Sequence, residues 1–71
     1  MPARHPVNVS DLKAAWHAAL AAEQSTYEAC CETRDFGPWH AAGYETDKRY
    51  HAFKAAFRRL HFRSPNESDL A

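Results

Sequence analysis

The dipeptide Gly37-Pro38 divides a chain of 71 residues into two stretches with helical periodicity. Glycine readily takes the left-handed conformation that stops a helix, and proline is favourable in the first turn of the next one. The chain is also rich in alanine and holds only two glycines, which favours helix over sheet. We therefore predict an all-α antiparallel hairpin, with a helix over about 11–34, a break at 35–37 in which glycine is the left-handed stop, and a second helix over about 38–63.

The first stretch has an apolar seam on one side. Ser10 precedes this seam and is predicted to be the N-cap, because its hydroxyl can accept hydrogen bonds from the free amides of the first turn. Asp11 suits the positive end of the helix dipole. The large apolar residues that recur at helical spacing, and should face a core or a dimer partner, are Leu12, Trp16, Leu20, Tyr27 and Cys30.

The second stretch carries a heptad seam in steps of four and three that includes Gly43. A glycine inside a helix costs about 1 kcal/mol relative to alanine. Two alternatives follow: one continuous helix over 38–63, which we favour, or a short helical turn near 38–43 before a main helix over 46–63. The large seam residues, again for a core or a dimer interface, are Trp39, Tyr50, Phe53, Phe57 and Leu60.

The two ends of the chain lack this periodicity. Residues 1–9 contain two prolines and are expected to form an extended arm. The pair Ser64-Pro65 ends the second helix, and residues 64–71 are expected to form a polar, flexible tail. A single helical-hairpin domain over residues 10–63 remains between them.

A lone hairpin of this size buries little surface. A chain near this length buries only about 60% of the surface that its unfolded form exposes. The two cysteines are adjacent, so they cannot form a disulfide framework. Each seam of a hairpin also has only one neighbouring helix. A second copy is the simplest source of more helices, so we expect a homodimer that completes a four-helix bundle.

Opposite charges dominate two parts of the chain, although the nine Lys and Arg balance the nine Asp and Glu overall. Residues 46–63 hold six bases and one acid, whereas the remainder holds three bases and eight acids. The net charge of zero, taken alone, favours neither nucleic acid nor a membrane surface as a binding partner. The longest apolar run, 18–22, is too short for a signal core or a membrane span. With no disulfide pattern either, a reducing cytoplasmic compartment is expected.

The basic end of the second helix is the candidate binding surface for another protein or a nucleic acid. Phe62 lies off the seam beside two arginines, where its ring could stack on a base or seat a side chain. Histidines in the same region would add positive charge below about pH 6.5. A solvated cationic face is the simpler interpretation, since amphipathic helices commonly have one. The candidate residues are His51, Lys54, Arg58, Arg59, His61, Phe62 and Arg63.

Glu23 interrupts the apolar seam of the first helix. A carboxylate buried there needs a cation or a hydrogen-bond donor opposite it. We expect it to face Lys54, Arg58 or His61 and to fix the register or the oligomeric state, as single polar seam residues do in coiled coils. A catalytic role is disfavoured, because no second acid or base lies at helical spacing on the same face.

The adjacent Cys30 and Cys31 raise the question of a metal site or a reactive thiol. Neighbours on a helix point about 100° apart, and zinc sites use cysteines separated by two to four residues. We expect Cys30 to fill the core as a small hydrophobe and Cys31 to lie on its flank. The five histidines form no ligand pattern. Neither a metal nor another cofactor is therefore expected.

The motifs of common enzyme classes are absent from the sequence, among them a Gly-rich phosphate loop, a nucleophile elbow and paired catalytic acids. We therefore expect a non-enzymatic protein-interaction module. It would be an adaptor, inhibitor or regulator that engages another protein through its charged helix faces and aromatic seam. The alternative is a nucleic-acid-binding helical dimer that uses the basic second helix for phosphate contact.

Overall fold

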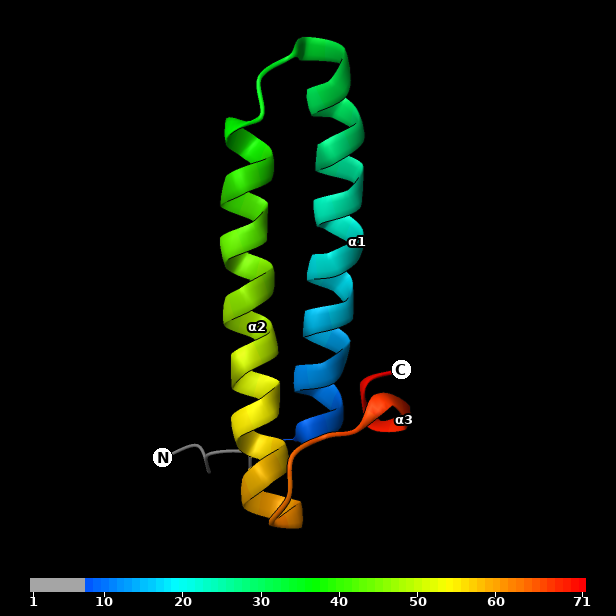
Figure 1. The fold of residues 1–71 in the computed structure, drawn as a ribbon, viewed down its shortest axis with the longest axis vertical. Coiled ribbons are helices and arrows are strands. Elements are labelled where there is room, and N and C mark those ends of the chain that lie inside the picture. Colours follow the sequence, from blue (N-terminus) through cyan, green and yellow to red (C-terminus); the bar gives the residue numbers. More distant parts are fainter. Residues whose placement is uncertain (1–7) are drawn as a thin grey trace, which may run out of the picture.

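Figure 1 shows two long helices side by side, followed by a short third helix. The computed structural model describes residues 8–71. In it, α1 spans Val9–Thr33, α2 spans Gly37–His61 and α3 spans Glu67–Leu70. The first two helices run antiparallel and pack along their length, which confirms the predicted all-α helical hairpin. No helix of the described segment is both long and apolar enough to span a membrane.

α1 begins two residues earlier than predicted, because Asn8 caps it. The Asn8 side chain accepts a hydrogen bond from the Ser10 N–H at 2.9 Å, and the Leu12 N–H donates to the Asn8 carbonyl at 3.1 Å. Ser10 is thus a residue of the first turn, and the prediction that it is the N-cap is wrong. The arm predicted for residues 1–9 lies outside the described residues, except for Asn8 and Val9 at the helix start.

Arg34, and not a glycine, takes the left-handed conformation at the turn. Its φ and ψ are 63° and 16°, and its N–H donates to the Cys30 carbonyl at 2.7 Å. Gly37 has no positive φ and begins α2, so its predicted role as left-handed stop is wrong. The Asp35 carboxylate accepts a hydrogen bond from the Gly37 N–H at 3.1 Å. A Cβ on Gly37 would lie 3.2 Å from that oxygen, so the glycine permits a close approach.

α2 is one continuous helix through Gly43, and the alternative of a main helix that starts at residue 46 is wrong. Gly43 faces α1, where a Cβ would lie 3.5 Å from Oε1 of Glu23. Thr46 is buried one turn further on, and its hydroxyl lies 3.0 Å from the Ala42 carbonyl and 3.3 Å from the Ala19 carbonyl of α1. Small residues therefore let the two helices approach closely at mid-length.

α2 ends at His61, two residues before the predicted end. Phe62 takes the left-handed conformation with φ 56°, and its N–H donates to the Arg58 carbonyl at 2.9 Å. This hydrogen bond satisfies one of the carbonyls that a helix end leaves free. Arg63 is consequently outside the helix and points back toward the hairpin, with its guanidinium carbon 5.0 Å from the centre of the Phe57 ring.

The best-buried part of the core lies toward the open end of the hairpin. Phe53 and Phe57 are 1% and 5% exposed, and their ring centroids are 5.9 Å apart. From α1, Trp16 stacks on Phe53 at 5.8 Å and meets the ring of Tyr50 at 5.0 Å. At the turn end, Cys30 is also buried. Burial of these rings is the main apolar contribution that holds α1 to α2.

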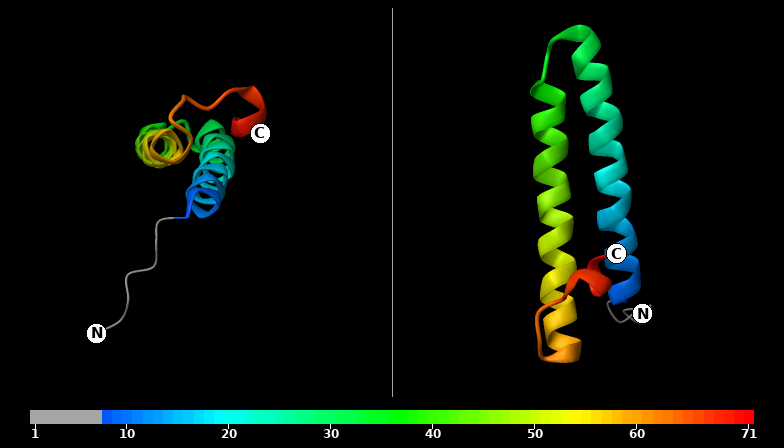
Figure 2. Two further views of the ribbon diagram at one scale, coloured as in Figure 1. Left: turned by 90° about the horizontal axis from the view of Figure 1, so that it is seen from below. Right: turned by 45° about the vertical axis from the view of Figure 1, so that its right-hand side comes forward.

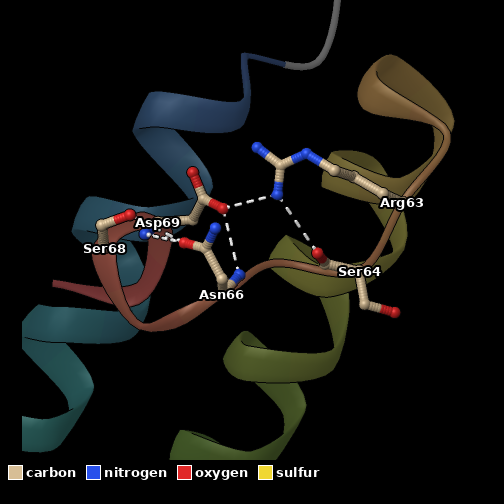
Figure 3. Close-up of polar contacts among 5 residues, drawn as sticks. All are labelled: Arg63, Ser64, Asn66, Ser68 and Asp69. Carbon is tan, nitrogen blue, oxygen red and sulfur yellow. Dashed lines mark hydrogen bonds and ion pairs between the residues drawn. The ribbon is translucent and has the colours of Figure 1, made fainter.

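The residues after α2, for which a flexible tail is predicted, fold back toward α1 (Figures 1 and 2). Asn66 and Asp69 form a capping box for α3, with each side chain accepting from the backbone N–H of the other. Figure 3 shows how Arg63 reaches the same carboxylate, at 2.7 Å. His17 of α1 donates from Nε2 to the Leu70 carbonyl at 2.8 Å. These contacts place α3 beside the first half of α1.

Candidate interaction surfaces

A groove runs between α1 and α2 in the half of the hairpin near the turn. It consists of two adjoining hollows, and Glu23 and Trp39 border both of them. We call this feature the aromatic groove, because indole and phenol rings form much of its wall. Its lining residues are Leu20, Glu23, Gln24 and Tyr27 from α1, and Trp39, His40, Gly43, Tyr44 and Asp47 from α2.

The rims of the aromatic groove continue along the hairpin as two heptad stripes. In steps of four and three, the α1 rim extends toward the N-terminus through His17 to Lys13. We call the side of the molecule that carries the groove and both stripes the groove side. The α2 rim extends by the same steps toward the C-terminus through four of the predicted binding residues, which are His51, Lys54, Arg58 and His61.

Several large apolar side chains of the groove remain accessible to solvent. Tyr44 is 79% exposed, and Leu20 and Tyr27 are each 41% exposed. Within residues 8–71 the buried apolar side chains are only Cys30, Phe53 and Phe57. The other predicted seam residues divide into two groups. Leu12, Trp16, Trp39 and Tyr50 are half-buried between the helices, whereas Leu20, Tyr27 and Leu60 are exposed.

Glu23 lies opposite Gly43 and not opposite the cations predicted to face it. It is half-buried, and its Oε1 would lie in ordinary contact, at 3.5 Å, with a Cβ at position 43. Lys54 lies eleven residues beyond Gly43, about 16 Å further along α2. Arg58 and His61 are more distant still. The expected pairing is wrong because the register of the hairpin brings the turn half of α2, which lacks Lys and Arg before residue 48, against this part of α1.

The other predicted binding residues gather at the end of α2. Phe62 is 92% exposed, and a shallow hollow beside it is lined by Arg58, Arg59, Arg63 and Ser64. A bulky residue in the left-handed conformation is strained, and burial of the ring does not offset that strain here. Arg59 is exposed on the outer side of the helix. This patch adjoins the groove side, with which it shares Arg58, and we call it the Phe62 patch.

Arg63 is engaged by the C-terminal segment. Its guanidinium donates to Asp69 Oδ2 at 2.7 Å and to the Ser64 carbonyl at 3.3 Å (Figure 3). The hydrogen bond from Arg63, followed by that from the Asn66 backbone N–H, lowers the pKa of the Asp69 carboxyl. The same hydrogen bond raises the pKa of Arg63. The charge of Arg63 is therefore partly neutralised within the chain by Asp69.

The two cysteines have different surroundings. Cys30 is 2% exposed and packs in the core, whereas Cys31 is exposed on the flank of α1. In the described segment, no group of three or more His, Cys, Asp or Glu side chains is placed to hold a metal ion. His40, which follows the cysteines across the turn, instead borders the aromatic groove and packs against Trp39 with ring centroids 5.2 Å apart.

Sequence reasoning missed two features of these surfaces. Tyr44 lies off the heptad seam, and its position one turn from His40 and Asp47 could have indicated a rim residue. The C-terminal turn was also missed, although the spacing Asn66-x-x-Asp69 is that of a capping box. The contact of His17 with Leu70 left no signal in the sequence, because it joins residues 53 positions apart.

Comparisons with models of protein families, with curated proteins and with solved structures find no match. The function of the chain is therefore argued from its own surfaces. Two of them stand out: an aromatic groove with acidic groups between the helices, and a basic patch around Phe62 at the end of α2.

Proposed function

We propose that this chain is a non-enzymatic protein-interaction module that associates with a second copy through its groove side and so forms a four-helix bundle. The observation that carries this proposal is the exposure of Leu20, Tyr27 and Tyr44 in a chain with so few buried apolar residues among those described. Covering these side chains removes apolar surface from water and supplies the neighbours that a two-helix core lacks.

The assembled bundle acts as an adaptor, inhibitor or regulator of another protein. The Phe62 patch supports this part of the proposal, because its exposed Arg59 and Phe62 lie outside the groove side and would stay accessible in the dimer. An aromatic ring among arginines is the composition that interface hot spots favour. A bait with Arg59→Glu and Phe62→Ala is expected to lose a protein that the native chain captures, whereas Lys48→Glu retains it. Equal capture by both variants would remove the patch from the interface.

Size-exclusion chromatography with light scattering tests the dimer. The native chain is expected to have twice the monomer mass at micromolar concentration. Leu20→Glu places a charge on the rim of the groove and is expected to give a monomer with unchanged helical circular dichroism. Ala18→Glu, on the exposed outer side of α1, is the matched control and should remain dimeric. A native chain that elutes as a monomer at all concentrations contradicts the proposal.

A second candidate function is the binding of single-stranded nucleic acid at the Phe62 patch. The 92% exposed ring between Arg58 and Arg59 favours it, because proteins bind single strands by base stacking combined with phosphate contacts. Fluorescence anisotropy with a labelled oligonucleotide at low salt is the test. Phe62→Ala should weaken binding, and Tyr44→Ala, an exposed ring away from the arginines, should not. Absence of binding at low salt would exclude this candidate.

A further inference from the structure

The hollow of the Phe62 patch has three arginines in its wall, and no acidic side chain of the described chain borders it. Of the three, only Arg63 forms an ion pair within residues 8–71. Arg58 and Arg59 are exposed, and the described residues leave their charges without an acidic partner. The hollow is therefore complementary to a ligand that carries negative charge.

The helix dipole explains the arginines of the last turn of α2 but not the aromatic residue that follows them. Cations stabilise the negative end of a helix without any ligand. Phe62, however, has a left-handed φ of 56°, at a position where glycine is the usual residue, and its ring is 92% exposed. Strained residues of this kind cluster at ligand-binding positions. The ring is thus available as the apolar contact of a ligand that the arginines bind.

Arg63 is shared between the Phe62 patch and the C-terminal segment. The residue lines the hollow, while its Nη1 donates to Asp69 Oδ2 at 2.7 Å and to the Ser64 carbonyl at 3.3 Å (Figure 3). The side chains of Arg63 and Asp69 are 49% and 22% exposed. Water screens an ion pair of this exposure, so it contributes little to stability. A carboxylate from outside the chain can therefore compete with Asp69 for the guanidinium group.

Resting on the proposed recognition role of the Phe62 patch, we propose that its ligand is an acidic segment of a protein partner and that Asp69 competes with this ligand for Arg63. Carboxylates of the segment pair with the two unpaired arginines, and an apolar side chain of the segment packs on the Phe62 ring. Arg63 turns from Asp69 to a further carboxylate of the segment. Binding of the partner consequently weakens the attachment of α3 to the hairpin, of which this ion pair is a part.

The surroundings of the patch favour an acidic protein segment over a nucleic acid. Only one ring accompanies the arginines of the hollow, whereas proteins bind single strands by stacking successive bases on aromatic side chains. The net charge of the chain is zero, and α3 carries Glu67 and Asp69, so a long phosphate backbone has few further cations to follow. A short acidic segment needs only the patch. A carboxylate is moreover the group that Arg63 binds in the structure.

Fluorescence anisotropy with the full chain and a short labelled peptide of alternating glutamate and leucine tests the class of ligand. This peptide is expected to bind, and a peptide with glutamine in place of glutamate is not. Arg59→Gln should weaken binding about threefold and Phe62→Ala about tenfold. Lys48→Gln, which removes the same charge from the outer side of α2, should leave the Kd unchanged. Equal weakening by Arg59→Gln and Lys48→Gln, or no binding of the acidic peptide, would overturn the proposal.

The competition is tested by the release of Arg63 from its internal partner. Asp69→Asn is expected to tighten peptide binding about threefold, because Arg63 then has no carboxylate within the chain. Glu67→Gln changes the net charge by the same amount on the same short helix and should not alter the Kd. In an Arg63→Gln background, Asp69→Asn should have no effect, since the two residues act through one contact. An unchanged Kd in Asp69→Asn, or the same tightening without Arg63, would overturn the competition.

The failure of this inference is separable from the failure of the proposed function. Capture of a protein by the native bait but not by the bait with Arg59→Glu and Phe62→Ala, without any binding of the acidic peptide, keeps the patch as a recognition surface and rejects its acidic ligand. Binding of a labelled oligothymidylate in place of the peptide assigns the patch to nucleic acid and also rejects the inference. A patch that binds neither probe, in a bait that captures no protein, rejects both the inference and the recognition role.

Discussion

Arg34 and Phe62, which follow α1 and α2, both have a positive φ, a conformation that an L side chain destabilises. A left-handed residue other than glycine costs about 1–2 kcal/mol. Both act as helix C-caps, where glycine is the commonest residue. The chain thus carries conformational strain at each end of α2, once in the turn and once beside the exposed ring of Phe62.

Arg34→Gly is expected to stabilise the chain by about 0.5–1 kcal/mol. Relief of the left-handed strain exceeds the greater freedom that glycine has in the unfolded chain. Urea unfolding followed by circular dichroism measures the change. Thr33→Gly, one residue earlier and still helical, serves as the control and should destabilise by about 0.3–0.5 kcal/mol. A loss of stability in Arg34→Gly would mean that the arginine side chain contributes more than its backbone costs.

The ion pair between Asp69 and Arg63 makes the C-terminal turn sensitive to acid. Because the pKa of Asp69 in the folded chain is lowered, the contact stabilises the turn above the ordinary pKa of about 4 and is lost as the pH falls through the lowered value. The Leu70 contact with His17 is therefore expected to open below about pH 4. The Leu70 amide signal in an NMR titration from pH 7 to 2 reports it.

Two variants isolate Asp69 from the other carboxyl groups that titrate in acid. Asp69→Asn should at pH 7 give the Leu70 signal of the native chain in acid, because it removes the charge that holds Arg63. Glu67→Gln, on the same short helix, should leave the signal in its native position. If Glu67→Gln moved the signal as far as Asp69→Asn does, the loss of any negative charge near α3, and not the loss of this ion pair, would explain the opening of the turn.

At the scale of elements, Gly43 is the residue that lowers the helical stability of α2 most. It is helical, has no positive φ and would tolerate a Cβ at 3.5 Å from Glu23, an ordinary van der Waals distance. The strain that favours glycine at a turn is therefore absent here. Glycine therefore leaves α2 with an entropic cost on folding that no close approach at this position requires.

Gly43→Ala is accordingly expected to stabilise the chain by about 1 kcal/mol through helix propensity. Ala41→Gly, exposed on the same helix, should destabilise by a similar amount and shows the scale of the effect. Thermal and urea unfolding give both values. A destabilised Gly43→Ala would indicate that the close approach of α1 and α2 at this point requires the missing side chain.

The extent of the two helices follows from local rules, and so it could be predicted to within about two residues at most ends. The remaining errors have specific causes. Asn8 and Ser10 are both good N-caps, and a sequence pattern does not select between them. The left-handed residue that ends α1 is Arg34 and not the expected Gly37, because the Asx turn of Asp35 lets α2 begin directly at Gly37.

At the scale of the whole molecule, the described chain is a hairpin with one well-covered aromatic cluster and one open groove. The proposed dimer through the groove side would couple folding to association, because the apolar surface around Leu20 is exposed in the single chain. In that proposal the interaction with a further protein is left to the Phe62 patch.

The melting temperature of the native chain is therefore expected to rise with protein concentration, by about 5 °C per tenfold increase for a dimer of this size. Circular dichroism melts at three concentrations across a hundredfold range measure it. Leu20→Glu should melt at one temperature throughout that range, because its monomer has no association step. A native chain with a concentration-independent melting temperature would contradict assembly through the groove.

The amino-acid sequence by itself determined the all-helical class, the hairpin and the seam that joins its helices, because helix caps, Gly-Pro breaks and heptad spacing act over a few residues. Only the tertiary structure decided which groups meet across that seam. Glu23 lies against Gly43, and His17 holds Leu70, because the close packing around Thr46 fixes the height of one helix against the other. A pattern that repeats every seven residues is nearly unchanged by a shift of one heptad, so this register is a property of the packed pair.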